Sequence, residues 1–460
     1  MTGFWATVRA AVAALFGSRN PGGVPAPTVP VPDNPVWTGA TKPDPIPESD
    51  VVLALPKDMY RHDLAPSEWW WHIGTLRAGD RTFGFEINAA SFIGQKFAMT
   101  QISLGDVEAG RHYQRTQVYG PAPLGVFDVA TWAEGDPSKD WYARLGDPDW
   151  TVGGFSVTNR GSGYTKAPKV KIEGDGSGAA GVAILDRGEV TQIVLLRPGT
   201  GYTTPPAITL VGGGGSGATA VPVRNWASMT ASKDDPTRIH VQAILVDTHS
   251  LDEVTFDLTV AQEGRPFWVW GTGIKPGGST QDLTKDNYYF SYTRLKTSGT
   301  ITVAGTEHHV TGTTWMDHEY GYFEGASPDR VMRWLLQDMQ LDNGYSISNA
   351  SIVTAGYKSE LGVTRDAYAT IQDPDGNLYH VASRITAIGE LWTSPTTGNV
   401  YVQQWRVEIP SFHADLTATV RLQNQEFPTQ NLAVYEGASS AEGTFLGATV
   451  AGDVWIEQVF

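Results

Sequence analysis

The stretch Ile239-His240-Val241-Gln242-Ala243-Ile244-Leu245-Val246 consists mostly of β-branched and aliphatic residues, a composition typical of a β-strand. Similar runs recur along the chain, for example at Thr82–Ile87 and Trp405–Ile409. Turn signals lie between such runs, among them Asp342-Asn343-Gly344 and Asp373-Pro374-Asp375-Gly376. Dense strands without long helical periodicity predict an all-β protein built from sandwiches or barrels.

The composition indicates folded domains with an acidic surface. The chain has 460 residues, which at about 150 residues per domain suggests two or three domains. Hydrophobic residues make up 41% of the chain and 16 residues are Trp, enough for buried cores. The net charge of −16 argues against a nucleic-acid partner, because an acidic surface repels phosphate. The chain has no Cys, which excludes disulfides, thiolate catalysis and Cys-ligated zinc.

The N-terminal region differs from the rest of the chain. Arg9 precedes a short apolar run at residues 10–16 that lacks a clear signal-peptide cleavage site, so an amphipathic helix or a disordered leader is an equally good interpretation. Residues 21–47 are rich in Pro, Gly, Val and Thr, which is typical of an extended linker. A turn of helix is expected within residues 49–60. No run of about 18 apolar residues predicts a membrane-spanning helix.

A tandem repeat interrupts the strand pattern. Gly161-Ser162-Gly163-Tyr164-Thr165 returns 38 residues later as Gly199-Thr200-Gly201-Tyr202-Thr203. Likewise, Gly176-Ser177-Gly178-Ala179 returns as Gly215-Ser216-Gly217-Ala218. The Gly density over residues 154–223 differs sharply from that of the flanking sequence. We therefore interpret this segment as two small β units inserted into a host domain.

The aromatic segment Glu68–His72 is the first candidate for a binding site. Alternate residues of a strand share a face, so Glu68, Trp70 and His72 would point to one side and the other two Trp residues to the opposite side. One interpretation is a core strand with one hydrated face. The other is a ligand cavity lined by Trp70, with Glu68 or His72 as its polar group.

The segment Trp315-Met316-Asp317-His318-Glu319-Tyr320-Gly321 is the second candidate. By the same rule Trp315, Asp317 and Glu319 share one face. Two carboxyl groups close together in an apolar setting would couple, which raises the pKa of one of them. Such an acid can protonate an alkene, while its ionised neighbour takes a proton from water. The alternative is solvent-exposed carboxylates on a sheet surface, which the flanking aromatic residues disfavour.

A third cluster, Tyr288–Arg294, is rich in aromatic residues and contains one cation. Its alternate residues Tyr288, Phe290 and Tyr292 predict either a core strand or the wall of a cavity. No metal is predicted, because the ten His are scattered and the adjacent pair His308-His309 would point to opposite faces. No serine-hydrolase triad is predicted, because a Gly-x-Ser-x-Gly elbow is missing, and no cofactor is predicted, because a dinucleotide fingerprint is missing.

Several segments together resemble the AttH-like family, which includes the hydroxyneurosporene synthase (carotenoid hydratase) group. They follow the family's order and spacing and cover about residues 55–152 and 225–460, so that the repeat falls in the gap. The matching segments are Glu68-Trp69-Trp70 leading to Gly74-x-Leu76, Phe83-Gly84-Phe85-Glu86, Trp315-Met316-Asp317-His318-Glu319, Trp334 to Gly344, Trp392-Thr393-Ser394-Pro395, Trp405-Arg406-Val407-x-Ile409-Pro410 and Tyr435-Glu436-Gly437-Ala438.

The resemblance implies two lipocalin-like antiparallel β-barrels in tandem, each able to enclose a small hydrophobic ligand. Family members include hydratases that add water to an isoprenoid double bond without a redox cofactor, and cyclases that include Diels–Alderases. An aromatic-x-Asp pair is implicated in the hydratases, and Trp315 and Asp317 match its position, with Trp in place of Tyr. Their His-x-Trp pair would fall near Tyr288-x-Phe290, where neither residue matches, so the substrate stays open.

We therefore expect a leader and Pro-rich linker at residues 1–48, a first barrel at 49–275 interrupted by the 154–223 insertion, and a second barrel at 276–460. The predicted function is a cofactor-free enzyme acting on a hydrophobic small molecule, such as a terpenoid, by acid-assisted hydration, elimination or cyclisation. Asp317 is the expected acid, and Glu319 or Glu68 the expected base or orienting group. The expected substrate-binding walls are Trp70, His72, Trp315, Tyr288, Phe290 and Tyr292.

Other functions stay open at this point. One is a lipocalin-like carrier or surface protein that holds a lipid, with the repeats as an attachment device. Another is a Diels–Alderase-type cyclase. The second barrel could also serve only to support the first. The sequence leaves the oligomeric state open, and the protein is either cytoplasmic or exported.

Overall fold

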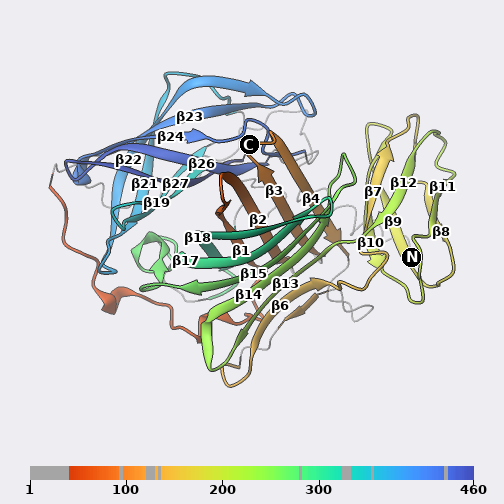
Figure 1. The fold of residues 1–460 in the computed structure, drawn as a ribbon, viewed down its shortest axis with the longest axis horizontal. Coiled ribbons are helices and arrows are strands. Elements are labelled where there is room, and N and C mark those ends of the chain that lie inside the picture. Colours follow the sequence, from red (N-terminus) through yellow and green to blue (C-terminus); the bar gives the residue numbers. More distant parts are fainter. Residues whose placement is uncertain are drawn as a thin grey trace.

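The computed structural model describes residues 41–92, 97–120, 130–132, 136–278, 282–323, 333–353, 357–428 and 434–459, so most of the expected leader lies outside the described residues. Nearly all regular structure is β, which confirms the all-β prediction (Figure 1). The described helices are single 3-10 turns, and none could cross a membrane. They are η1 (Glu48–Asp50), η2 (Lys57–Met59), η4 (Val269–Gly271) and η6 (Pro410–Phe412).

The first barrel is a large curved sheet around the main hydrophobic core. Its strands follow the order β5-β6-β13-β14-β15-β17-β18-β1-β2-β3-β4, and β16 pairs with β17. The strand bounds are β1 Ser67–Ala78, β2 Arg81–Phe92, β3 Phe97–Asp106, β4 Arg111–Tyr119, β5 Ala130–Trp132, β6 Trp141–Gly146, β13 Trp226–Ser232, β14 Asp235–Val246, β15 Glu253–Gln262, β16 Phe267–Trp268, β17 Asn287–Val303 and β18 Thr306–Gly321.

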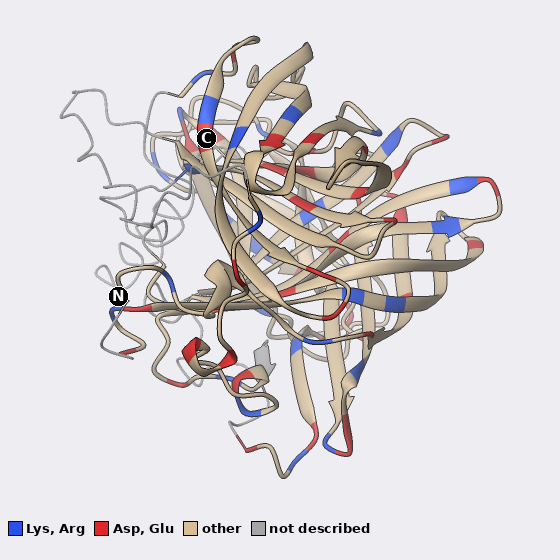
Figure 2. Ribbon diagram, turned by 90° about the vertical axis from the view of Figure 1, so that its left-hand side faces the viewer, with Lys and Arg blue, Asp and Glu red and all other residues tan. Residues whose placement is uncertain are grey.

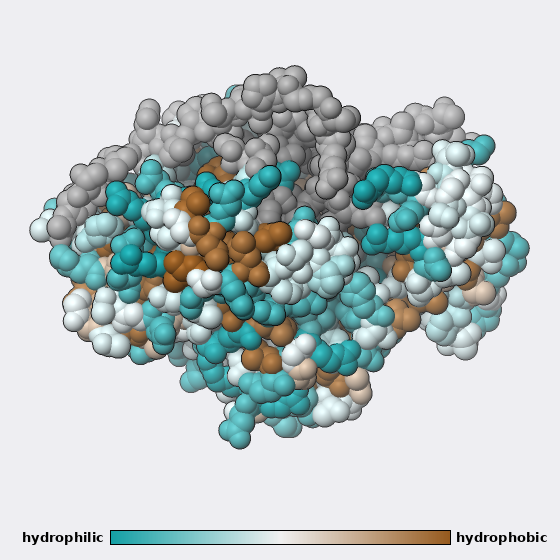
Figure 3. All heavy atoms as spheres, turned by 90° about the horizontal axis from the view of Figure 1, so that it is seen from above, coloured by the Kyte–Doolittle hydropathy of each residue, from teal (hydrophilic) through white to brown (hydrophobic). Residues whose placement is uncertain are grey.

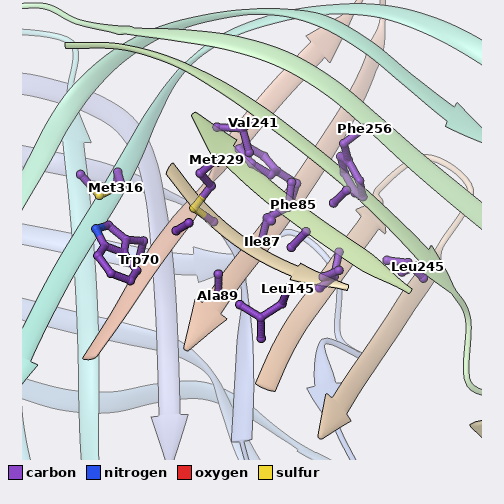
Figure 4. Packing of buried hydrophobic residues seen from close by; sticks show 14 of the residues in the cluster. Trp70, Phe85, Ile87, Ala89, Leu145, Met229, Val241, Leu245, Phe256 and Met316 are labelled. Carbon is purple, nitrogen blue, oxygen red and sulfur yellow. The ribbon is translucent and has the colours of Figure 1, made fainter. Parts of the chain in front are cut away.

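Side chains from alternate strand positions point inward and fill the core of the first barrel. Trp70 from β1, Phe85 from β2 and Met316 from β18 point into one packed cluster with side chains from β13 to β15, such as Phe256 (Figure 4). These residues alternate with others that point outward, as expected for strands with one face on a core. The outward face of β1 and β18 is also covered, because it packs against the second barrel.

The Gly-rich repeats form a module at one end of the first sheet, where two of its strands continue the strand order beyond β4 and some of its side chains join the main core (Figure 1). β6 and β13 are antiparallel neighbours in which Gly146 lies opposite Trp226, so the module occupies the position of their connecting turn. One parallel pair, Leu195 opposite Tyr119, joins it to β4. The module strands are β7 Gly154–Asn159, β8 Lys169–Glu173, β9 Ala180–Asp186, β10 Glu189–Arg197, β11 Ala207–Val211 and β12 Thr219–Val223.

The two repeats pair with each other rather than folding separately. Ser162 of the first repeat bridges to Ser216 of the second, and Thr200 of the second bridges to Ser177 of the first. A Cβ atom on Gly161 would come within 2.4 Å of the backbone of Ser216, so the close strand approach requires glycine there. The repeated glycines therefore have a structural explanation.

The second barrel is closed and lipocalin-like. Its eight strands follow the order β24-β23-β22-β21-β20-β19-β27-β26, and β26 pairs with β24 to complete the ring, while the short β25 adds to β26. Its strands are β19 Arg333–Leu341, β20 Ser346–Val353, β21 Thr364–Gln372, β22 Leu378–Thr393, β23 Val400–Ile409, β24 Ala414–Val420, β25 Glu426–Phe427, β26 Val434–Phe445 and β27 Ala448–Val459.

The boundary between the two barrels lies later in the sequence than expected. The sequence placed the boundary at residue 276, but β17 pairs with β15, and β18 pairs with β1, so both strands belong to the first sheet. The reason is that β17 continues the antiparallel meander of β13, β14 and β15, and β18 then returns the chain to the first strand. The second barrel begins with β19 at Arg333.

The two barrels are in direct contact through β2 against β26 and β1 against β27. Gly84 on β2 permits this contact, because a Cβ atom there would lie 2.5 Å from the Cβ of Ala438. Gln340 Nε2 of the second barrel donates hydrogen bonds to the Thr293 and Thr314 carbonyls of the first. These contacts fix the orientation of the two barrels relative to each other.

The described surface carries dispersed charge. Red acidic and blue basic segments are distributed over strands and turns, and no large block of blue is visible among the described residues in Figure 2. On the face shown in Figure 3, apolar groups form small areas among polar ones. The chemically unusual groups are instead inside the molecule.

Candidate functional site

The neighbouring strands β1 and β18 present two different buried faces. Asp317 lies opposite Trp71 and Glu319 lies opposite Trp69, and directly opposed residues of an antiparallel pair point to the same side. This side faces the second barrel. Glu68 lies one position away from Trp69 and therefore points into the first barrel. The structure thus brings Asp317 and Glu319 together but separates Glu68 from them.

The expected substrate-binding residues are divided in the same way. The aromatic core of the first barrel includes most of them, and the face towards the second barrel includes one. Facing inward are Trp70, His72, Tyr288, Phe290 and Tyr292, and facing the second barrel is Trp315.

The Asp317 carboxyl is buried and held by neighbouring donors. It is 4% exposed, and its Oδ1 atom accepts hydrogen bonds from Ser291 Oγ at 2.5 Å and Trp315 Nε1 at 2.6 Å. Burial raises the pKa of Asp317 to about 6, although hydrogen bonds from Ser291, Trp315 and Tyr289 act in the opposite direction. The carboxyl can therefore be ionised at neutral pH despite its surroundings.

Glu319, two residues further along β18, holds its proton more tightly. Burial raises its pKa to about 8, a hydrogen bond with Asn287 lowers it, and the charge of Asp317 raises it again. On one strand face, a carboxyl that ionises readily thus neighbours one that stays protonated at neutral pH. The structure places Asp317 and Glu319 on one strand face, as parity predicted, and the charge of Asp317 acts on the pKa of Glu319, while their catalytic roles stay a prediction.

The second barrel contributes further acidic groups to the same space. Glu457 on β27 accepts a hydrogen bond from Trp334 Nε1 at 2.8 Å, and burial raises its pKa to about 7. The pKa of Asp338 on β19 is raised well above its ordinary value by burial and by the charges of Asp317 and Glu457. Both Asp338 oxygens are buried, and the hydroxyl of Ser348, which lowers the pKa of Asp338, is too poorly aligned for a full hydrogen bond.

The acidic groups continue along β2 and β26. Glu436 lies directly opposite Glu457, and its carboxyl is 3.5 Å from Gln101 Nε2 and 3.5 Å from Trp455 Nε1. Burial and the charge of Glu457 raise the pKa of Glu86 well above its ordinary value, while side-chain hydrogen bonds with Glu436 and Gln101 act in the opposite direction.

Aromatic rings surround these acids. Trp315 packs with Ile73 and Trp455, and its ring centroid lies 5.6 Å from that of Phe267. Tyr289 is half-buried beside the carboxyls, and after desolvation the charges of Asp317 and Asp338 contribute most to raising its pKa. The face between the barrels therefore combines proton donors, one readily ionised carboxyl and aromatic walls, which suits proton transfer to an apolar molecule.

The inner face of the same strands carries a different set. Glu68 Oε1 is 2.8 Å from His62 Nδ1 and 3.4 Å from His318 Nε2. Burial lowers the pKa of His62, but hydrogen bonds with Asp58 and Glu68 outweigh it and raise the pKa to about 9. The rings of His62 and Tyr320 stack with centroids 3.6 Å apart. Glu68 is thus part of a histidine cluster and not of the acidic face.

Comparison with known proteins gives the family. The family model described as AttH-like matches residues 208–457, more than half of the chain. The chain belongs to the AttH-like family. No curated protein matches this AttH-like chain.

Two solved structures share the AttH-like fold. A protein assigned as AttH from Nitrosomonas europaea is 16% identical with a TM-score of 0.54, and the match covers 90% of this chain and 98% of that one. Kievitone hydratase from Nectria haematococca is 14% identical with a TM-score of 0.54, and the match covers 93% of this chain and 98% of that one. At these identities the likeness establishes the fold and confirms the lipocalin-like prediction.

Some residues of the AttH-like site were missed from the sequence. Tyr289 and Ser291 alternate with the aromatic residues that were singled out in Tyr288–Arg294, so strand parity could have placed them on one face. Asp338 and Glu457 come from distant strands of the second barrel, and no local pattern marks them. The same holds for His318, which lies 250 residues from Glu68.

Proposed function

We propose that this AttH-like protein is a cofactor-free enzyme that adds water to a carbon–carbon double bond of a hydrophobic small molecule, or catalyses the reverse elimination, between its two barrels. The observation that carries this proposal is the pairing of Asp317 with the neighbouring carboxyl Glu319. Burial raises the pKa of the first to about 6 and of the second to about 8. One group can accept a proton at a pH at which the other donates one.

The pKa order reverses the roles expected from the sequence, in which Asp317 was the acid. In the proposed hydration, Glu319 gives its proton to one alkene carbon, and the oxygen of a water molecule bonds to the other carbon. Asp317 takes the proton that this water loses. Glu319, now ionised and with the higher pKa, recovers the proton from Asp317, so the site returns to its starting state.

The surroundings favour this chemistry. Protonation of an alkene develops positive charge on carbon, which the faces of Trp315 and Trp71 can stabilise. Two hydrogen bonds end on Asp317 Oδ1, which orients the carboxylate. Burial and the charges of Asp317 and Glu457 raise the pKa of Asp338 well above its ordinary value, which favours the protonated form and makes Asp338 a second candidate donor.

Labelled water tests the proposal. The purified protein would be incubated with kievitone and a panel of isoprenoid alkenes in H2(18)O, and products analysed by mass spectrometry. We expect a product that has gained one labelled water, with turnover reduced about 10²–10⁴-fold in Asp317→Asn. Asp366→Asn, which changes a carboxylate with a 95% exposed side chain, is the matched control and should retain turnover.

The alternatives give different results in the same experiment. Full turnover by Asp317→Asn would overturn the proposed role of this carboxyl. A product that is an isomer of the substrate and carries no label would indicate cyclisation instead of hydration. A lipid that co-purifies in native mass spectrometry, with no product from any compound, would favour the carrier.

A further inference from the structure

Three side chains inside the first barrel converge on one point, on the face of β1 and β18 opposite Asp317. One ligand atom from each of His62, Glu68 and His318 can be chosen so that all three lie within 4.8 Å of one another. Glu68 Oε1 occupies the middle, 2.8 Å from His62 Nδ1 and 3.4 Å from His318 Nε2. Two imidazoles and one carboxylate are a common ligand set for first-row divalent metals.

The backbone fixes which nitrogen of His318 is available. Its Nδ1 atom lies 2.9 Å from the Trp69 carbonyl oxygen, which can only accept, so Nδ1 carries the hydrogen. In the neutral ring, Nε2 then presents a lone pair. His318 is fully buried, and its Nε2 makes no well-aligned hydrogen bond among the described residues, although the Asp58 backbone lies close to the ring. This lone pair faces Glu68 Oε1, another acceptor, so a proton or a cation is needed between them.

His62 is oriented in the manner of a metal ligand. While its Nδ1 faces Glu68, its Nε2 is 3.4 Å from Asp58 Oδ1. Asp58 is itself held by the backbone nitrogen of Ala54, which donates to Oδ2 at 2.6 Å. Metal-binding His residues typically donate their second ring N–H to a carboxylate or a backbone carbonyl. Both His residues of this cluster have such a partner.

We propose that His62, Glu68 and His318 bind one divalent transition-metal ion of the Zn²⁺ or Fe²⁺ class inside the first barrel. With metal–ligand distances of about 2.0–2.2 Å, neighbouring ligand atoms of a tetrahedral site lie about 3.3–3.5 Å apart. The separation of His318 Nε2 from Glu68 Oε1, 3.4 Å, already has this value. His62 Nδ1, now 2.8 Å from Glu68 Oε1, would need to move away by roughly 0.5–0.7 Å while staying within reach of His318. The site is independent of the proposed hydration, which takes place on the other face of the strands.

The ion would fasten the segment that precedes β1 to the barrel. His62 lies in the loop between η2 and β1, whereas Glu68 and His318 lie on paired strands. Binding to the folded chain alone stabilises it in proportion to the logarithm of the free ion concentration. Added metal should therefore raise the melting temperature of the protein.

Cobalt and zinc binding test this site. Tag-free protein would first be stripped of metal with a chelator. It would then be titrated with Co²⁺, with binding detected by visible absorption, and separately with Zn²⁺, with binding measured by calorimetry. We expect one ion per chain and a higher melting temperature. Glu68→Gln should weaken binding at least 100-fold, and Asp58→Asn, which removes only the orienting carboxylate, about 10- to 100-fold. Glu319→Gln changes the opposite face of the same strand and should bind as the parent does.

Two results would overturn the site. One is a parent protein that binds neither ion, which would leave Glu68 and His62 as an ion pair only. The other is Glu68→Gln protein that binds both ions like the parent. If Glu68→Gln fails to fold, as judged by circular dichroism, His62→Gln replaces it, because that side chain is 13% exposed and lies in a loop. Metal binding that persists in His62→Gln would equally contradict the proposal.

Discussion

Ser291 on β17 donates a 2.5 Å hydrogen bond to Oδ1 of Asp317 on β18, at directly paired positions of the two strands. This contact holds the carboxyl on the face towards the second barrel. Trp315, two residues before Asp317, donates to the same oxygen. The stability of the Asp317 carboxylate in an apolar setting therefore depends on a few identifiable donors.

Removing the Ser291 hydroxyl should make Asp317 a weaker acid. A hydrogen bond to a charged group is worth about 1.5–3 kcal/mol, or about 1–2 pKa units. In Ser291→Ala we expect the Asp317 pKa to rise by about this amount. The pKa would be measured by carbon-13 NMR of protein labelled at the Asp carboxyls. Ser351→Ala removes a hydroxyl that donates to the backbone at Asp366 and should leave the value unchanged. An equal pKa in parent and Ser291→Ala would show that this bond is not important.

The stability of the protein should depend on pH through Glu319. Burial raises its pKa from 4.5 to about 8, so the folded chain binds a proton that the unfolded chain has lost between these pH values. This contribution to the free energy of unfolding is complete below pH 4.5 and is lost as the pH rises towards 8. Glu319→Gln should match the parent near pH 5 and exceed its stability by a few kcal/mol at pH 8, measured by urea unfolding. A constant difference across this range would contradict the raised pKa.

Contact between the barrels should be sensitive to a single methyl group. A Cβ atom at Gly84 would lie 2.5 Å from the Cβ of Ala438, so Gly84→Ala should cost about 1–3 kcal/mol of stability. Gly105 faces Gly84 across β2 and β3, and a Cβ atom there would meet other atoms only at 3.5 Å or more. Gly105→Ala is therefore the control. Equal unfolding midpoints for the two variants would show that β2 and β26 can separate freely.

The repeat module should be dispensable for the barrels. β6 and β13 pair from Trp141 opposite Ala231 to Gly146 opposite Trp226 without any help from the repeats. Replacing residues 154–223 by a short Gly-Ser linker should lower the free energy of unfolding by about 1–3 kcal/mol, because contacts such as Arg115 Nη1 to the Phe155 carbonyl are lost. The Asp317 titration should not change. A deletion variant that fails to fold would show that the module is part of the first barrel.

The fold was predictable because its signals are local. Alternation in segments such as Ile239–Val246 marks strands, and the repeated Gly161–Thr165 motif marks an insertion. The domain boundary was placed too early because the pairing of β18 with β1 joins residues about 250 positions apart. Strand order of this kind depends on tertiary packing, and no local pattern encodes it.

The site was predictable only in part. Parity correctly grouped Trp315, Asp317 and Glu319, and their burial agrees with the aromatic flanks. Parity within one strand could not show that Glu68 points away from Asp317, because this depends on the register between two strands. The contribution of Asp338 depends on how two complete barrels pack, which is still further from local sequence.

The central claim is that the substrate binds between the barrels and not inside the first one. Fluorine NMR of protein containing 5-fluorotryptophan tests this directly, with resonances assigned by Trp→Phe variants. The ligand is the compound that the labelled-water screen identifies as substrate. We expect the signals of Trp315 and Trp71 to shift on binding and the signal of Trp70 to stay unchanged. A shift of Trp70 with Trp315 and Trp71 unchanged would contradict this claim.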